Sequence, residues 1–282
     1  MLSFGERLDA TFSRQGQLCL GIDPHSFLLT EWGLADTADG VRTFALKAIE
    51  SAAGVVGIVK PQVAFFERHG SAGYAVLEEV LAAARAAGLL VIADAKRGDV
   101  GSTVAAYTQA WLSPGSPLEA DAMTISAYQG VGSLTESVEF AQLHGKGLFV
   151  LAATSNPESF ALQAAVLDSG DDAGITVAAS IVAEVNELNE SSEHLGSVGV
   201  VIGATVRAAD YGIAAGSLAF TPILAPGFGE QGATLADLPA LYGMVSTNVV
   251  ANVGRSVLRT GPDKLRGALV KVAAELQEAL AS

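Results

Sequence analysis

The sequence predicts an α/β protein built as a (β/α)8, or TIM, barrel, and three observations favour this fold class. Eight short apolar runs recur along the 282 residues, helical patterns lie between them, and polar side chains gather where the runs end. Most runs are apolar nearly throughout, as expected for strands buried on both faces of a parallel sheet. Eight strand–helix repeats in about 250 residues suggest a closed barrel. We expect one barrel domain over residues 1–282.

The apolar runs each end in Gly, Pro or a polar cluster. They cover residues 17–23, 55–60, 89–94, 121–126, 147–154, 197–203, 220–226 and 246–253. A doubly wound open sheet is the competing fold. No G-x-G-x-x-G pattern follows the first run, which weakens the dinucleotide-binding version of that sheet.

Helices are predicted where apolar residues recur at helical spacing between the runs. A possible cap at Ser71 opens one helix that Gly88 ends, and the last helix is expected to start at Pro262. Residues 156–173 are predicted to form an extra loop or short helix with a solvated acidic end. The apolar stripes of five helices are Tyr74, Leu77, Leu81 and Ala84; Val104, Tyr107 and Trp111; Val131, Leu134, Val138 and Ala141; Ala178, Ile181, Val185 and Leu188; and Leu265, Leu269, Val272, Leu276 and Leu280.

Composition limits the partners and the location. The formal net charge is −14, and an acidic surface repels nucleic acid and anionic membranes, so we expect neither as a partner. The single cysteine, Cys19, lies in an apolar run and is expected to be a buried, inert thiol. The amino-terminal residues lack the apolar segment of a signal peptide, and no run approaches the roughly 18 apolar residues of a membrane span. The protein is therefore expected in the cytoplasm.

The stretch 89–103 carries the densest cluster of chemical groups. Asp94 and Lys96 are two residues apart, so on a strand they point to the same face. Gly98 allows a tight turn, and Asp99 and Thr103 are four apart and are expected on one helix face. The carboxyl end of a buried strand is where α/β folds place their chemistry. A salt-bridged strand end that only stabilises the turn is the alternative.

In a barrel, the other strand ends converge on the same mouth. Asp23 follows the first run and would contact a ligand hydroxyl or cap the next segment. Lys60 ends the second run and would contact a ligand or extend its ammonium to solvent. The four histidines, His25, His69, His144 and His194, show no metal-ligand spacing.

A glycine-rich loop and an arginine follow the last two runs. The loop begins at Pro226 and continues Gly227-Phe228-Gly229-Glu230-Gln231-Gly232, and Gly254-Arg255 follows the eighth run. Loops after strands seven and eight of such barrels often bind phosphate through backbone N–H groups. Glycine allows close approach to the anion, and Arg255 could clamp it in a bidentate manner. We predict a phosphate site here.

The combination of these motifs resembles the orotidine 5′-phosphate decarboxylase family, in the bacterial branch that carries D-A-K-R-G-D. The resemblance covers residues 18–256 with every motif in the family's order. It rests on Asp23, Lys60, Asp94-x-Lys96-x-x-Asp99, Pro226-Gly227-x-Gly229-x-Gln231-Gly232 and Gly254-Arg255-Ser256.

The resemblance implies a homodimeric barrel that converts orotidine 5′-monophosphate to UMP and CO₂, the last step of de novo UMP synthesis. It implies neither a metal nor an organic cofactor. Lys60, Asp94, Lys96 and Asp99 would form the charged catalytic network, with Lys96 between the two acids as proton donor to C6. Asp99 and Thr103 would reach the neighbouring subunit's site. The remaining implied contacts are Asp23 and Lys60 with ribose hydroxyls, Ser155 with the pyrimidine, and Gln231 and Arg255 with the phosphate.

Two rivals remain open. A sugar-phosphate decarboxylase or aldolase with the same D-x-K-x-x-D core would depend on Mg²⁺ and carry an acid where this chain has Lys60. A non-catalytic barrel that senses a nucleotide would keep the phosphate loop without needing Asp94, Lys96 and Asp99 together.

Overall fold

Eight parallel strands close into a barrel in chain order, with β1 hydrogen-bonded to both β2 and β8. The computed structural model describes residues 1–281, without the side chain of Ala215. Each predicted run overlaps one strand, although β2, β3 and β7 extend past the ends of their runs, and the (β/α)8 prediction is confirmed. The strands are β1 (Leu18–Ile22), β2 (Ile58–Pro61), β3 (Leu90–Arg97), β4 (Ala122–Ile125), β5 (Gly147–Ala153), β6 (Val198–Ile202), β7 (Ile223–Phe228) and β8 (Val249–Val253).

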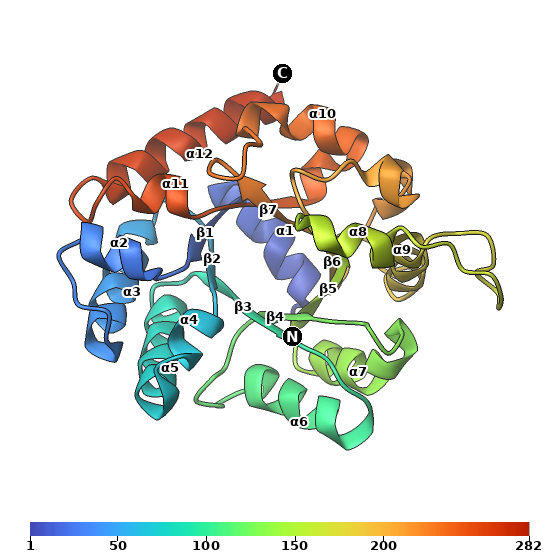
Figure 1. The fold of residues 1–282 in the computed structure, drawn as a ribbon, viewed down its shortest axis with the longest axis horizontal. Coiled ribbons are helices and arrows are strands. Elements are labelled where there is room, and N and C mark those ends of the chain that lie inside the picture. The colour runs from blue at the N-terminus through green and yellow to red at the C-terminus, as the bar shows by residue number, and fades with distance from the viewer. Residues whose placement is uncertain (282) are drawn as a thin grey trace.

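Helices surround the barrel on its outer side (Figure 1). Helices cover the strands on the outside, and side chains of the other strands cover them on the inside, so almost every strand residue is buried. The runs therefore do not alternate between apolar and polar residues. The outer helices are α2 (Ser26–Glu31), α3 (Ala38–Ala52), α4 (Ala64–Glu67), α5 (Gly70–Ala86), α6 (Gly101–Leu112), α7 (Thr135–Leu143), α8 (Phe160–Gln163), α9 (Val177–Glu187), α10 (Leu238–Tyr242), α11 (Arg255–Leu258) and α12 (Leu265–Ala281).

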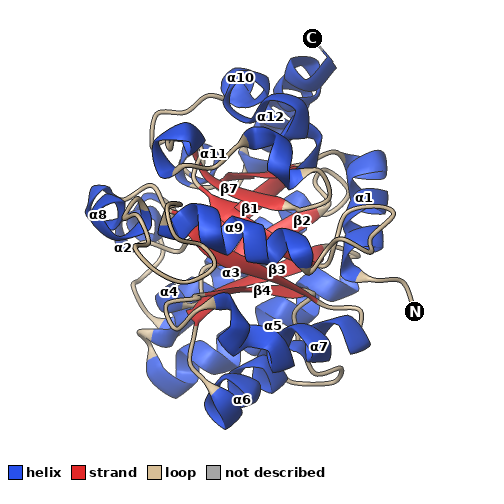
Figure 2. Ribbon diagram, turned by 90° about the vertical axis from the view of Figure 1, so that its right-hand side faces the viewer, coloured by secondary structure: helices blue, strands red, loops and turns tan. Residues whose placement is uncertain are grey.

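One further helix, α1 (Phe4–Gln15), lies across the amino-terminal end of the barrel (Figure 2). Ser3 and Glu6 form a capping box that starts it, a signal present in the sequence but not used in the prediction. Phe4 and Leu8 are fully buried against the barrel interior, and Phe4 meets Phe149 edge to face at 6.0 Å. This apolar contact closes one end of the barrel.

The barrel interior also contains Cys19, which is fully buried. Burial raises the pKa of its thiol to about 12, so the sulfur stays protonated and unreactive near neutral pH. The predicted burial of Cys19 is confirmed.

Several predicted boundaries differ from the structure. Helix α5 begins at Gly70 with His69 as its N-cap residue, so Ser71 lies inside the first turn instead of capping it. Helix α12 begins at Leu265, three residues after Pro262. The pattern analysis missed α3, whose start is capped by Thr37 Oγ1 accepting the N–H of Gly40 at 3.2 Å.

The segment 156–173 contains a 3-10 turn and the short helix α8. Its acidic end projects from the body of the molecule beyond α9 (Figure 1) and is largely exposed. None of the helices described combines the length and apolar character needed to cross a lipid bilayer.

Candidate active site

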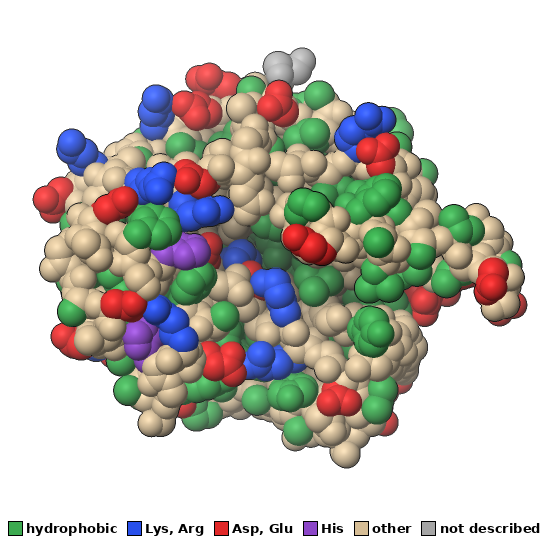
Figure 3. Space-filling model, viewed as in Figure 1, with side chains coloured by type: hydrophobic (Ala, Val, Ile, Leu, Met, Phe, Trp, Pro, Cys, Tyr) green, Lys and Arg blue, Asp and Glu red, His purple; other side chains and the backbone are tan. Residues whose placement is uncertain are grey.

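A cavity of about 650 Å³ opens at the carboxyl ends of the strands, opposite α1. Figure 3 shows this mouth as a hollow near the centre of the face, with Lys and Arg side chains beside it. All eight strands, or the loops that follow them, contribute lining residues. Among those residues are Asp23, Lys60, Asp94, Lys96, Thr124, Ser155, Val201, Pro226, Gln231, Gly254 and Arg255.

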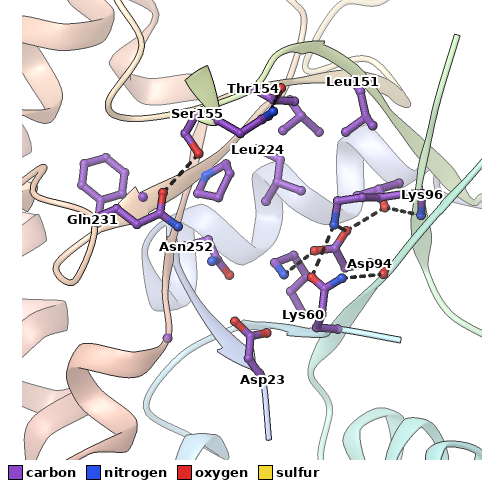
Figure 4. Close-up of a pocket in the computed structure, with 18 of the residues that line it drawn as sticks. Asp23, Lys60, Asp94, Lys96, Leu151, Thr154, Ser155, Leu224, Gln231 and Asn252 are labelled. Atoms are coloured by element: carbon purple, nitrogen blue, oxygen red, sulfur yellow. Dashed lines mark hydrogen bonds and ion pairs between the residues drawn. The ribbon is translucent and has the colours of Figure 1, made fainter. Parts of the chain in front are cut away.

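Asp94 is the centre of the charged network at this mouth. Its Oδ2 accepts from Lys60 Nζ at 2.7 Å, and its Oδ1 accepts from Lys96 Nζ at 2.6 Å and from Thr124 Oγ1 at 2.9 Å. With its side-chain amide turned so that oxygen and nitrogen exchange places, Gln62 donates to the same carboxylate and accepts from Lys96 Nζ at 3.3 Å. Figure 4 shows Lys60 and Lys96 converging on Asp94.

Burial and charge act in opposite directions on this network. Burial alone would raise the pKa of Asp94, but the ammonium groups of Lys60 and Lys96 outweigh it and hold the pKa below its ordinary value. Burial would lower the pKa of Lys60, but the carboxylates of Asp94 and Asp23 raise it above its ordinary value. Asp94 and Lys60 therefore remain charged at neutral pH.

The backbone at Lys96 is strained. Its φ of 47° is in the left-handed region, and no other non-glycine residue in the part of the chain that the structure describes has a positive φ. The β3–β4 pairing is irregular between Ala93 and Arg97, and the Lys96 N–H bonds Thr124 Oγ1 at 2.9 Å. Such strain persists only where surrounding contacts hold it, and it is concentrated at functional sites.

A second polar cluster lies on the other side of the cavity, with Leu224 between the two in Figure 4. Ser155 Oγ donates to Gln231 Oε1 at 3.1 Å. Gly227, Gly229 and Gly232 have φ values of 118°, 84° and 105°, which an L side chain would adopt only with strain. The loop that carries Gln231 is therefore shaped by glycine, as a backbone anion site requires.

The structure separates Asp99 and Thr103 from the other predicted residues. Helix α6 begins at Gly101, so Asp99 precedes the helix and does not share a face with Thr103. Neither residue lines the cavity of its own chain, and Asp99 Oδ1 accepts the N–H of Val100 at 2.8 Å. Lys96 pairs with Asp94 of its own chain, and its expected position between Asp94 and an Asp99 from a neighbouring subunit stays a prediction.

Gly98 also has a different role from the one expected. Its φ is not in the left-handed region, so it does not make a turn that needs glycine. A Cβ atom at this position would lie 2.5 Å from the carbonyl oxygen of Ser126. Gly98 is required because two backbone segments approach closely.

Sequence analysis missed Thr124, and it placed Asn252 at the end of the eighth run without assigning it a role. Thr124 and Asn252 are polar residues within apolar runs, and that exception is the signal that could have identified them. The Oδ1 atoms of Asn252 and Asp23 are buried without a hydrogen-bond partner in the structure. Because an unpaired buried oxygen is costly, both atoms are positioned to accept from a ligand.

The fold and the site together define a (β/α)8-barrel enzyme whose buried Asp–Lys network faces a cavity at the carboxyl ends of the strands. A sequence model of the orotidine 5′-phosphate decarboxylase / HUMPS family matches residues 16–268, and the chain belongs to this family.

Similar proteins cover the whole chain. The orotidine 5′-phosphate decarboxylase of a Nocardioides species is 50% identical over 279 residues, which are 98% of this chain and 100% of the relative. That of Streptomyces coelicolor is 49% identical over 285 residues, 99% of each chain. A crystal structure of a Streptomyces avermitilis protein assigned the same activity superposes with a TM-score of 0.94 at 48% identity, covering 100% of this chain and 97% of the other.

Proposed function

We propose that this protein decarboxylates orotidine 5′-monophosphate to UMP and CO₂, the last step of de novo UMP synthesis. The observation that carries the proposal is Asp94, buried and charged between Lys60 and Lys96 at the wall of the cavity. Family membership and relatives of about half identity support the same reaction. We also propose that it acts in the cytoplasm.

Decarboxylation leaves an electron pair on C6 of the pyrimidine when the bond to the carboxylate carbon breaks. No neighbouring carbonyl group takes up this charge directly, so a fixed cation is needed. In the proposal, the Lys96 ammonium stabilises the developing charge and transfers its proton to C6 while CO₂ leaves. Asp94 aims Lys96 through the 2.6 Å ion pair, and solvent returns the proton to the amine afterwards.

The remaining residues would bind the ends of the substrate. Asp23 and Lys60 would hold ribose hydroxyls, and the unpaired Oδ1 of Asp23 supports an acceptor role. Ser155 would contact the pyrimidine. The phosphate would be held by Gln231, Arg255 and the backbone of Pro226 and Gly254. Phosphate binding far from the reacting carbon can help assemble the site, so loop 227–232 is proposed as part of a lid.

Asp99 and Thr103 would act in the neighbouring subunit of a homodimer. Their absence from the lining of their own cavity supports this part of the proposal. Exposed apolar side chains lie close to them in the sequence, at Val100 and Tyr107, as expected for a surface that a second copy covers.

The decisive test is the absorbance change when orotidine 5′-monophosphate is added to protein that has been stripped of metal with EDTA. We expect full turnover to UMP. Turnover of a sugar phosphate that requires added Mg²⁺ would instead identify the sugar-phosphate rival. Tight UMP binding without release of CO₂ would identify the nucleotide-sensing rival.

A further inference from the structure

The side chain of Arg97 bonds the backbone just before the strained residue Lys96. Its Nη1 donates to the carbonyl oxygen of Ala95 at 3.0 Å, so its guanidinium closes a short loop around Lys96. Arg97 is not among the residues that line the cavity. Its contacts therefore bear on the shape of the main chain that carries the proposed proton donor.

The other end of the guanidinium is fixed to the outer helices. Arg97 Nη2 donates to Glu67 Oε1 and to the hydroxyl oxygen of Tyr74, both at 3.2 Å. The Tyr74 hydroxyl in turn donates to Glu67 Oε1 at 2.9 Å. The ring of Tyr107, on α6, lies 5.7 Å from the guanidinium carbon, within cation–π range. Groups of α4, α5 and α6 thus hold one side chain.

The main chain of Arg97 is fixed independently. Its carbonyl oxygen accepts the N–H of Ser126 at 2.7 Å, just beyond the end of β4. Gly98 follows and approaches the Ser126 carbonyl too closely for any Cβ atom. The backbone after Lys96 therefore has its own anchor. The peptide group before Lys96 is held by two side chains, because Thr124 Oγ1 accepts its N–H at 2.9 Å and Arg97 Nη1 donates to its carbonyl oxygen at 3.0 Å.

We propose that Arg97 is a positioning residue that holds the left-handed backbone of Lys96, so that the Lys96 ammonium stays on Asp94 and faces the cavity. Its role in turnover rests on the proposed decarboxylation, but its effect on the Lys96 backbone does not. The planar guanidinium bonds Ala95 through Nη1 and Glu67 through Nη2, whereas lysine has a single nitrogen from which to donate.

The test compares Arg97→Ala, Arg97→Lys and Glu67→Gln with the wild type. Arg42→Ala is the matched control, because it removes an arginine that pairs with Glu79 between α3 and α5, away from the cavity. The measurements are kcat and KM for orotidine 5′-monophosphate, calorimetric Kd for UMP, and a crystal structure of Arg97→Ala. Glu67→Gln weakens the anchor without touching Arg97.

We expect Arg97→Ala to lower kcat by about 10- to 100-fold, the scale on which a displacement of about 1 Å acts, with KM and the UMP Kd changed less than about threefold. Arg97→Lys should recover part of the loss, Glu67→Gln should show a smaller loss in kcat, and Arg42→Ala should match the wild type. In the crystal, Lys96 should leave the left-handed region.

Three results would overturn the inference: Arg97→Ala with an unchanged kcat, Arg97→Ala with a raised KM and an unchanged kcat, or a crystal structure in which Lys96 keeps its φ and its contact with Asp94. If Arg97→Ala does not fold, an unchanged kcat in Glu67→Gln overturns it. A wild type that does not decarboxylate the nucleotide would refute the proposed function, and the crystal structure would still decide the role of Arg97.

Discussion

Both ends of the barrel contain buried charged groups. The ends differ in whether buried polar atoms near those groups lack a hydrogen-bond partner. At the amino-terminal end, Asp121 accepts from Arg7 at 2.6 Å and from the N–H of Val91 at 2.9 Å. Lys146 pairs with Glu119 at 2.8 Å. Helix α1 covers this end of the barrel. The ion pairs at this end connect α1 and the loops to the strands.

At the carboxyl-terminal end, Asp94 is as well paired as Asp121, but its surroundings are not complete. A cavity adjoins it, Asp23 and Asn252 each have an unpaired buried oxygen, and the backbone of Lys96 is strained. An ion pair alone therefore does not mark a functional site. Strain, unpaired oxygens and an adjoining cavity together distinguish the end that binds a ligand from the end that is only closed.

The largest difference between the two ends is expected when one lysine is removed from each. Lys96→Ala should lower kcat by about 10⁴-fold or more, because both charge stabilisation and proton transfer are lost, while the fold stays intact. Lys146→Ala should lower the stability of the fold, because it breaks a buried ion pair, and should leave turnover unchanged. Stopped-assay kinetics and urea denaturation of both variants test this, and near-normal kcat in Lys96→Ala would remove the proposed acid.

Deleting the apolar contact between α1 and the barrel should affect stability alone. Phe4→Ala leaves a cavity beside Phe149 and should lower the free energy of unfolding by about 3–5 kcal/mol. Leu2→Ala, at an exposed neighbouring position, is the control and should change it little. A fall in kcat of the folded Phe4→Ala protein would show that the two ends are coupled, contrary to the comparison.

The proposed phosphate site at Gln231 and Arg255 can be distinguished from the charged network around Asp94 by its effect on KM. Arg255→Ala should raise KM for orotidine 5′-monophosphate by about 10- to 100-fold, because a charge-assisted contact with the phosphate is lost. The same variant should handle orotidine, which has no phosphate, as the wild type does. Steady-state kinetics with both compounds check this, and an unchanged KM for the nucleotide rules out the clamp.

The smallest expected signal comes from mixed subunits. Lys96→Ala and Asp99→Ala should each be inactive alone, but a mixed dimer holds one intact site if Asp99 acts across the interface. Random exchange should then restore about a quarter of the wild-type activity. The assay follows CO₂ release after subunit exchange has been demonstrated, and no recovery would place Asp99 in its own chain's site.

The sequence predicted the barrel because buried parallel strands are apolar on both faces, and each such run ends where its residues turn polar. It also placed Asp94 beside Lys96, since residues two apart on a strand share a face. The left-handed φ of Lys96 and the start of α6 after Asp99 depend on packing against β4 and were not predictable from spacing. Thr124 could not be predicted in the same way, because one polar residue inside an apolar run has no partner at a diagnostic spacing.

A crystal structure of the protein with bound UMP tests the central claim most directly. The account predicts that Lys96 Nζ lies about 3–3.5 Å from C6 of the base, the separation of reacting atoms in a near-attack geometry, while its ion pair with Asp94 is kept. A base bound elsewhere, or an Nζ pointing away from C6 with no protonated group in its place, would contradict it.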